Sequence, residues 1–220
     1  MWACDFLPVI DLFFRQIYEF LIIELASRRI VHFGVTSHRI DAWLEQGLRE
    51  ATPYGQAPRS LIRGQDRRFG QAFARVAKES SIEILKTPYR ALKANAVCER
   101  FLGSVRREYL DQLVIVAERH LHHVIQEYVC FFNCARSHQG IEQGTPGRIA
   151  SELARQEGGK ILALAVLNGL HNEYRRAVRV GNSPNKFARG CWRPQTSPSS
   201  RASGRAAPLP RKLDTRESWA

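Results

Sequence analysis

The sequence has few cysteines, a shortage of acidic residues and no long uninterrupted apolar run. Its five cysteines form no paired CxxC pattern, so they predict reduced thiols in a cytoplasmic protein and exclude a zinc site of that kind. Asp5, Asp11, Arg15 and Glu19 interrupt the apolar stretches near the start, so no membrane span is predicted. No basic segment precedes the first apolar run, and a secretory signal peptide is therefore not expected.

Acidic residues are outnumbered by basic ones. The 220 residues include 33 Lys and Arg against 21 Asp and Glu, which gives a net charge of +12. A strongly basic chain favours a polyanionic partner such as nucleic acid. Residues 175–220 hold 11 of the basic residues and only 2 of the acidic ones. Residues 179–220 are rich in Pro, Ser, Gly, Ala and Arg without periodicity, and they predict a disordered basic tail.

The rest of the chain predicts one mixed five-stranded α/β sheet flanked by helices, because three antiparallel strands are followed by alternating strands and helices. Strands are expected at residues 3–9, 16–25, 29–36, 60–63 and 82–86. Helices are expected at residues 37–50, 69–79, 95–113, 117–136 and 148–156. Ser37 is the expected cap of the first helix. Residues 160–170 are expected to form a short β-hairpin because of the family resemblance that is described below.

The helix after Asn95 contains the first candidate site residue. Asn95 is a good N-cap, and apolar residues repeat every four positions from Val97 to Tyr109. Glu99 lies in the first turn, where the helix dipole favours an ionised carboxylate. Spacing alone leaves two interpretations open for Glu99, which are an ordinary capping acid and a hard oxygen ligand for a metal ion.

Several motifs occur in the same order as in DDE integrases and transposases of bacterial insertion sequences, and the chain resembles that family over roughly its first 175 residues. The residues that carry the resemblance are Trp2 to Phe6, Ile62 to Gly70, Pro88, Ala94 to Ala96, Glu99 to Phe101, Arg106 to Glu108, Glu127, Tyr128, Phe132, Asn133, Arg136, His138 to Ile141, Thr145 and Pro146. The resemblance implies an RNase H-like catalytic core at residues 1–147. It further implies a helix and hairpin extension at residues 148–178, before the tail.

The family uses an Asp, Asp, Glu site that holds two Mg²⁺ or Mn²⁺ ions for phosphoryl transfer on DNA ends. The resemblance assigns the first Asp to Asp5 and the Glu to Glu99, both as catalytic residues and metal ligands. The second Asp should lie 35 residues before Glu99, and Gly64 occupies that position. Asp66 is a weak substitute, because residues two apart in extended chain are displaced by about 6.5 Å.

The resemblance also predicts partners. These are DNA, in the form of mobile-element ends and target, and further copies of the same chain in a bacterial cytoplasm. Five basic residues around the Glu99 helix are the candidate DNA contacts: Arg90, Lys93, Arg100, Arg106 and Arg107.

The leading hypothesis is an integrase-type core, from a truncated or degenerate copy, whose chemistry is impaired at Gly64. The DNA-end-binding helix-turn-helix segment of the family has no counterpart before Trp2, so the strand that carries Asp5 is expected to fray. One alternative is a nucleic-acid-binding remnant of a mobile element without chemistry, and another is a fragment without function. A dependence on divalent metal would distinguish the enzyme from the remnant.

Overall fold

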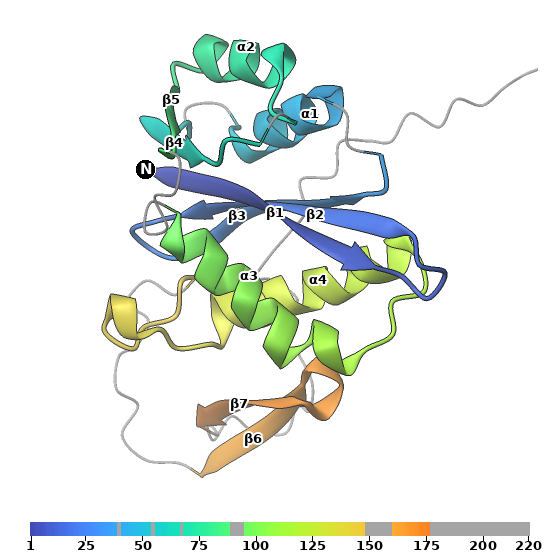
Figure 1. The fold of residues 1–220 in the computed structure, drawn as a ribbon. Coiled ribbons are helices and arrows are strands. Elements are labelled where there is room, and N and C mark those ends of the chain that lie inside the picture. The colour runs from blue at the N-terminus through green and yellow to red at the C-terminus, as the bar shows by residue number, and fades with distance from the viewer. Residues whose placement is uncertain (39–40, 54–55, 67, 89–94, 148–159, 177–220) are drawn as a thin grey trace, which may run out of the picture.

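The computed structural model describes residues 1–38, 41–53, 56–66, 68–88, 95–147 and 160–176 (Figure 1). Within these residues, a sheet of five strands lies between two pairs of helices. A separate two-stranded sheet lies beyond the second pair (Figure 1). The predicted helix at residues 148–156 and the predicted tail at residues 179–220 lie outside the described residues.

The five-stranded sheet has the order β3-β2-β1-β4-β5. Its strands are β1 (Trp2–Ile10), β2 (Gln16–Glu24), β3 (Ile30–Thr36), β4 (Ser60–Arg63) and β5 (Glu83–Lys86). The first three form an antiparallel meander, whereas β4 pairs in parallel with both β1 and β5. The prediction of a mixed five-stranded sheet is confirmed. The pairing of β1 does not favour the expected fraying of the Asp5 strand, because β1 is the central strand and pairs with β2 over its whole length and with β4 at Trp2, Ala3 and Cys4.

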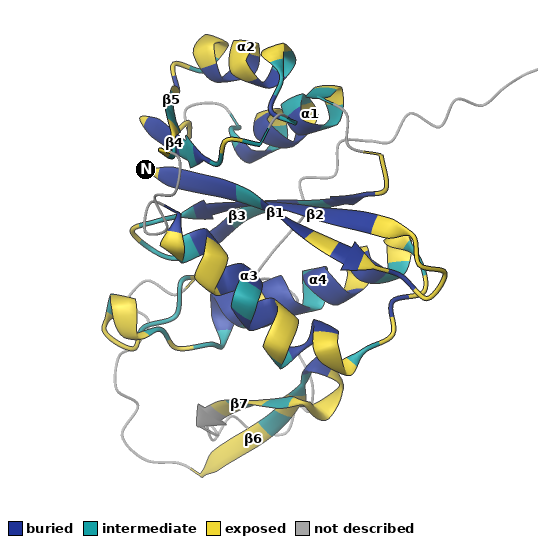
Figure 2. Ribbon diagram, viewed as in Figure 1, coloured by how far each residue is buried: buried dark blue, intermediate teal, exposed yellow. Residues whose placement is uncertain are grey.

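Two helices cover each face of this sheet (Figure 1). Helices α1 (Asp41–Ala51) and α2 (Gln71–Glu79) cover one face, and α3 (Ala96–Glu108) and α4 (Glu118–Cys134) cover the other. Strand side chains alternate between the two faces, so β2 contributes Phe20 and Ile22 to the first core and Leu21 to the second. The buried residues therefore form two apolar layers, one on each side of the sheet (Figure 2).

Two helix starts differ from the predictions. Helix α1 begins at Asp41, and the Ser37 hydroxyl donates to the Glu118 carboxylate at 2.8 Å. The predicted cap by Ser37 involves residues 39–40, which lie outside the described residues. Helix α2 begins after Gly70, which has no side chain to cap it. The Asp41 carboxylate takes that role and accepts hydrogen bonds from the backbone N–H groups of Gly70, Ala72 and Phe73. Such a cap between distant residues leaves no local sequence signal.

Helices α3 and α4 pack through aromatic side chains. The Phe101 and Phe132 rings meet edge to face, with their centroids 4.8 Å apart. The Tyr109 hydroxyl donates to the Glu127 carboxylate at 2.7 Å, and the Tyr128 hydroxyl donates to that of Glu108 at 2.7 Å. These buried aromatics confirm the predicted inward faces, although α3 ends before a short 3-10 turn at Leu110–Gln112 and does not continue to residue 113.

The second sheet is a hairpin of β6 (Ile161–Val166) and β7 (His171–Arg176). It confirms the hairpin predicted near residues 160–170 but extends to Arg176. Its turn is tied to the core, because Leu167 is buried and the Asn168 side-chain amide donates to the Tyr109 hydroxyl at 3.2 Å. Most of β6 is exposed (Figure 2). No helix in the described parts of the chain combines the length and apolarity needed to span a bilayer.

Candidate active site

Asp5 lies in the middle of β1 and faces helix α3. The neighbouring β1 residues Ala3 and Leu7 belong to the core layer under α3 and α4, and strand alternation places Asp5 on the same side. Its carboxylate is half-buried and accepts two hydrogen bonds. The Phe6 backbone N–H donates to Oδ1 at 2.9 Å, and the Asn95 side-chain amide donates to Oδ2 at 3.0 Å.

Asn95 occupies the N-cap position of α3, but its side chain makes no capping hydrogen bond. The predicted capping role is therefore wrong. Its side-chain amide instead donates to Asp5 Oδ2 and to the Cys4 carbonyl, at 3.0 and 3.3 Å. Asn95 is 6% exposed, and its Oδ1 atom is buried without a hydrogen-bond partner. Sequence analysis missed this positioning role, although Asn95 lies in the motif that carries the family resemblance.

Two further carboxylates lie within electrostatic reach of Asp5. Burial raises the pKa of Asp5, and the negative charges of Glu99 and Asp66 raise it further, against the hydrogen bonds from Phe6 and Asn95. The structure therefore places β1, the start of α3 and the segment after β4 within electrostatic reach of one another. A cation placed among these groups would relieve their repulsion.

Asp66 is engaged by its neighbour Arg68. The Arg68 guanidinium lies 3.0 Å from Asp66 Oδ2, and the Arg68 backbone N–H donates to Oδ1 at 3.0 Å. Both carboxylate oxygens therefore have a partner already. This arrangement disfavours Asp66 as a metal ligand, because the Arg68 contacts would have to be given up first.

Gly64 lies beside Asp5. The parallel ladder between β1 and β4 pairs Ala3 with Ile62 and Cys4 with Arg63, so the next pair in register is Asp5 with Gly64. Ile62 packs against the core layer under α3, and alternation directs position 64 to that same face. A Cβ atom on Gly64 would meet nothing closer than the Asp66 backbone nitrogen at 4.0 Å. Its φ lies outside the left-handed region, so an aspartate would fit here without strain.

The donor set does not match a two-metal site. Such a site needs about three carboxylates to hold two divalent ions. Within the described residues, no three or more His, Cys, Asp or Glu side chains are grouped so as to hold a metal ion. Asp5 and Glu99 alone would supply a charge of −2, because Gly64 carries none. The residues present therefore do not fit the metal pair that the fold implies.

Three of the five basic candidates belong to α3 and are exposed: Arg100, Arg106 and Arg107. The Arg106 guanidinium donates to the Pro8 carbonyl at 2.8 Å, and Arg107 is exposed near Gly103. Arg100 lines a cavity between α3 and the segment after α4. Arg90 and Lys93 lie outside the described residues.

Comparison with known proteins supports this reading of the fold. Residues 80–146 match the family model of the integrase core domain. The HTLV-2 integrase catalytic core domain in complex with magnesium superposes with a TM-score of 0.52 at 12% identity, over 66% of this chain and 91% of that one. A chain of the simian T-cell lymphotropic virus intasome in complex with PP2A regulatory subunit B56 gamma gives 0.53 at 12% identity, over 66% of this chain.

The present chain spans only about half, 51%, of that intasome chain. No curated protein is matched by the sequence. At this level of identity the structural matches establish the fold, whereas the family model identifies the segment that contains α3 and α4. Residues 80–146 therefore match the integrase core domain, and the fold of the chain is similar to that of a retroviral integrase catalytic core.

Proposed function

We propose that this chain is an integrase or transposase catalytic-core protein of a mobile element, whose metal-dependent phosphoryl transfer on DNA ends is impaired. The observation that carries the proposal is the place of Gly64. It directly follows β4, one position beyond the Cys4–Arg63 pair of the β1–β4 ladder, where a third carboxylate would extend the set of Asp5 and Glu99. Since the HTLV-2 core is in complex with magnesium, the ion proposed here is Mg²⁺ or Mn²⁺.

The chain's own residues would perform two tasks in this site. Asp5 and Glu99 supply negative charge from two elements that the fold holds rigidly, and Asn95 fixes the orientation of the Asp5 carboxylate. A divalent ion would supply charge stabilisation at the reacting phosphate. With Gly64 in place of a ligand, the affinity for that ion should be low, because two carboxylates must offset the whole charge of the metal pair.

Gly64→Asp should strengthen the binding of Mn²⁺ and Mg²⁺. The new carboxylate adds charge beside Asp5 at little structural cost, because the position is open and its backbone is unstrained. At a metal concentration 100 times the dissociation constant, the variant should gain about 2.7 kcal/mol of stability. Calorimetry and thermal unfolding with and without metal measure both effects. Gly64→Asn is the matched control, since it adds the same bulk without charge and should bind metal as weakly as the unmodified protein.

The proposal of impairment is tested by DNA nicking. The unmodified protein should show no nicking or joining of DNA ends above background in Mn²⁺. If it shows such activity, and Asp66→Asn abolishes it, then Asp66 has replaced the missing ligand and the site is not impaired.

A second candidate function is a non-catalytic nucleic-acid-binding remnant, which the incomplete donor set and the net charge of +12 favour. Its binding to DNA would be equal in EDTA and in Mn²⁺, and it would remain inactive after Gly64→Asp.

Under either function the proposed partners are mobile-element DNA and further copies of the chain. Homo-oligomers are consistent with the dimeric and trimeric forms described for the HTLV-2 core. The proposed location is the bacterial cytoplasm.

A further inference from the structure

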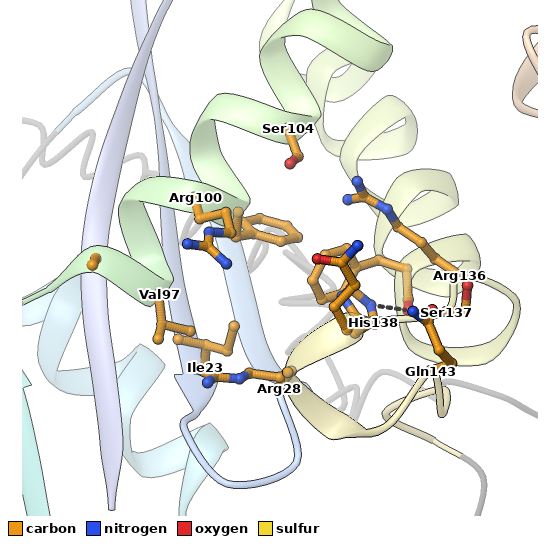
Figure 3. A pocket seen from close by; sticks show the side chains of 14 residues that line it. Ile23, Arg28, Val97, Arg100, Ser104, Arg136, Ser137, His138 and Gln143 are labelled. Carbon is orange, nitrogen blue, oxygen red and sulfur yellow. Dashed lines mark hydrogen bonds between the residues drawn. The ribbon is translucent and has the colours of Figure 1, made fainter.

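A cavity of about 450 Å³ lies beside the first turns of α3 (Figure 3). Three parts of the chain enclose it. These are the turn between β2 and β3, the N-terminal half of α3, and the segment of residues 136–143 after α4. Each part contributes one arginine to the lining (Figure 3). The β2–β3 turn contributes Arg28, α3 contributes Arg100, and the segment after α4 contributes Arg136.

The lining of this cavity carries positive charge only. Three arginines and His138 line it, together with neutral and apolar residues, and no aspartate or glutamate does. Arg136 is partly neutralised, because its guanidinium lies 2.5 Å from the Glu108 carboxylate. Neither Arg28 nor Arg100 forms an ion pair with a described residue. Two guanidinium charges therefore face the cavity without a counter-charge from the described part of the chain.

The pKa of His138 is lowered in these surroundings. Burial lowers its pKa, and the neighbouring charges of Arg136 and Arg28 lower it further, against a hydrogen bond between its ring and the Phe132 carbonyl. Arg28 and Arg136 are thus close enough to His138 to act on an anion bound beside it. A bound anion would be stabilised by each of them, and most strongly by guanidinium groups, whose planar fork matches the oxygens of a phosphate.

We propose that this cavity holds a phosphate group of a nucleic-acid strand whose reacting end is directed to Asp5 and Glu99. The proposal rests on the function proposed above. Arg100 directly follows Glu99, so the cavity and the acidic site lie beside the same turn of α3, with the two side chains about 100° apart around the helix. Ile23 and Val97 provide apolar walls for the sugar, and Ser104, Ser137 and Gln143 provide hydrogen-bonding groups. A free phosphate compound has the same oxygen chemistry and is the competing source.

The first test measures binding of a short labelled single-stranded oligonucleotide to the full chain in EDTA, by fluorescence anisotropy. Arg28→Gln and Arg100→Gln should each weaken binding about tenfold, because each removes a charge-assisted contact. Each should also lower the slope of log affinity against log salt by about 0.7. Arg29→Gln is the matched control, since Arg29 is exposed in the same turn and does not line the cavity. An equal loss for all three variants would overturn the proposal, because it would show general charge attraction.

The second test uses the unmodified protein, so it does not depend on how the variants fold. Arginines are modified with phenylglyoxal in EDTA and located by mass spectrometry. The oligonucleotide should protect Arg28 and Arg100 but not Arg29. If pyrophosphate protects Arg28 and Arg100 while the oligonucleotide does not, the cavity is a small-anion site and the proposal is wrong. Both tests exclude divalent metal, so failure of metal-dependent chemistry leaves their outcome unchanged.

Discussion

Replacing Glu19 should stabilise the protein strongly above neutral pH. Glu19 lies in β2 between Leu7 of β1 and Val35 of β3 and is fully buried. Neither of its carboxylate oxygens has a hydrogen-bond partner among the described residues. Burial raises its pKa from 4.5 to about 8. Glu19→Met should raise the free energy of unfolding at pH 9 by about 2–4 kcal/mol, because it replaces a buried charge with an adaptable apolar chain of similar length.

The pH dependence follows from the direction of this pKa shift. Below pH 4.5 the carboxyl is protonated in both the folded and the unfolded state, so its ionisation does not change the free energy of unfolding. Between pH 4.5 and about 8 only the unfolded state releases the proton, so stability falls by about 1.4 kcal/mol per pH unit and then levels off. Glu19→Gln should remove this pH-dependent loss of stability. Urea unfolding at pH 5, 7 and 9 measures the loss as the difference in the free energy of unfolding between the variant and the unmodified protein.

Glu142→Gln is the control, because Glu142 is exposed, and it should follow the unmodified protein at every pH. If the stabilities of the Glu19→Gln variant and the unmodified protein differ by the same amount from pH 5 to pH 9, then Glu19 is not an uncompensated buried acid.

Asn133→Ala should destabilise the fold by about 2–5 kcal/mol, since it leaves two buried backbone groups without partners. Asn133 is 3% exposed at the end of α4. Its Oδ1 accepts from the Ile30 backbone N–H at 2.9 Å, and its side-chain amide donates to the Ile30 carbonyl at 3.1 Å. This pair of bonds joins α4 to the start of β3, close to the irregularity in the β2–β3 pairing.

Chemical denaturation measures the loss, and hydrogen exchange at the Ile30 amide locates it. The exposed Asn172→Ala on β7 is the control and should change stability by less than about 0.5 kcal/mol. A loss below about 1 kcal/mol, with unchanged protection of the Ile30 amide, would show that water replaces the Asn133 side chain without cost.

The features that sequence predicted well are those that repeat within one element. Strand β4 has the predicted bounds, Ser60–Arg63, because an apolar run lies there between two loops. The inward face of α4, from Leu121 to Phe132, follows directly from its helical period. Periodicity reports which side of an element is buried, and it is therefore reliable where burial decides the structure.

The features that sequence missed join residues far apart in the chain. The Asn95 side chain reaches Asp5 across 90 positions, and the Asp41 carboxylate caps a helix that begins 30 residues later. Local propensity expected Asn95 to cap its own helix, but its side chain donates to Asp5 and to the Cys4 carbonyl instead. The resemblance paired Asp5 with Glu99, whereas the role of Asn95 became visible only once β1 and α3 were placed together.

The central position of β1 has a consequence for protein synthesis. Strands β2 and β3 complete one side of β1 as soon as residue 36 is available, because they follow it directly in the meander. The other edge of β1 must wait for β4, whose first pair joins Trp2 to Leu61. During that interval the nascent chain presents an unpaired edge of apolar strand, the feature that promotes association between chains. Slow elongation between residues 36 and 63 would therefore lengthen the period in which this protein depends on chaperones.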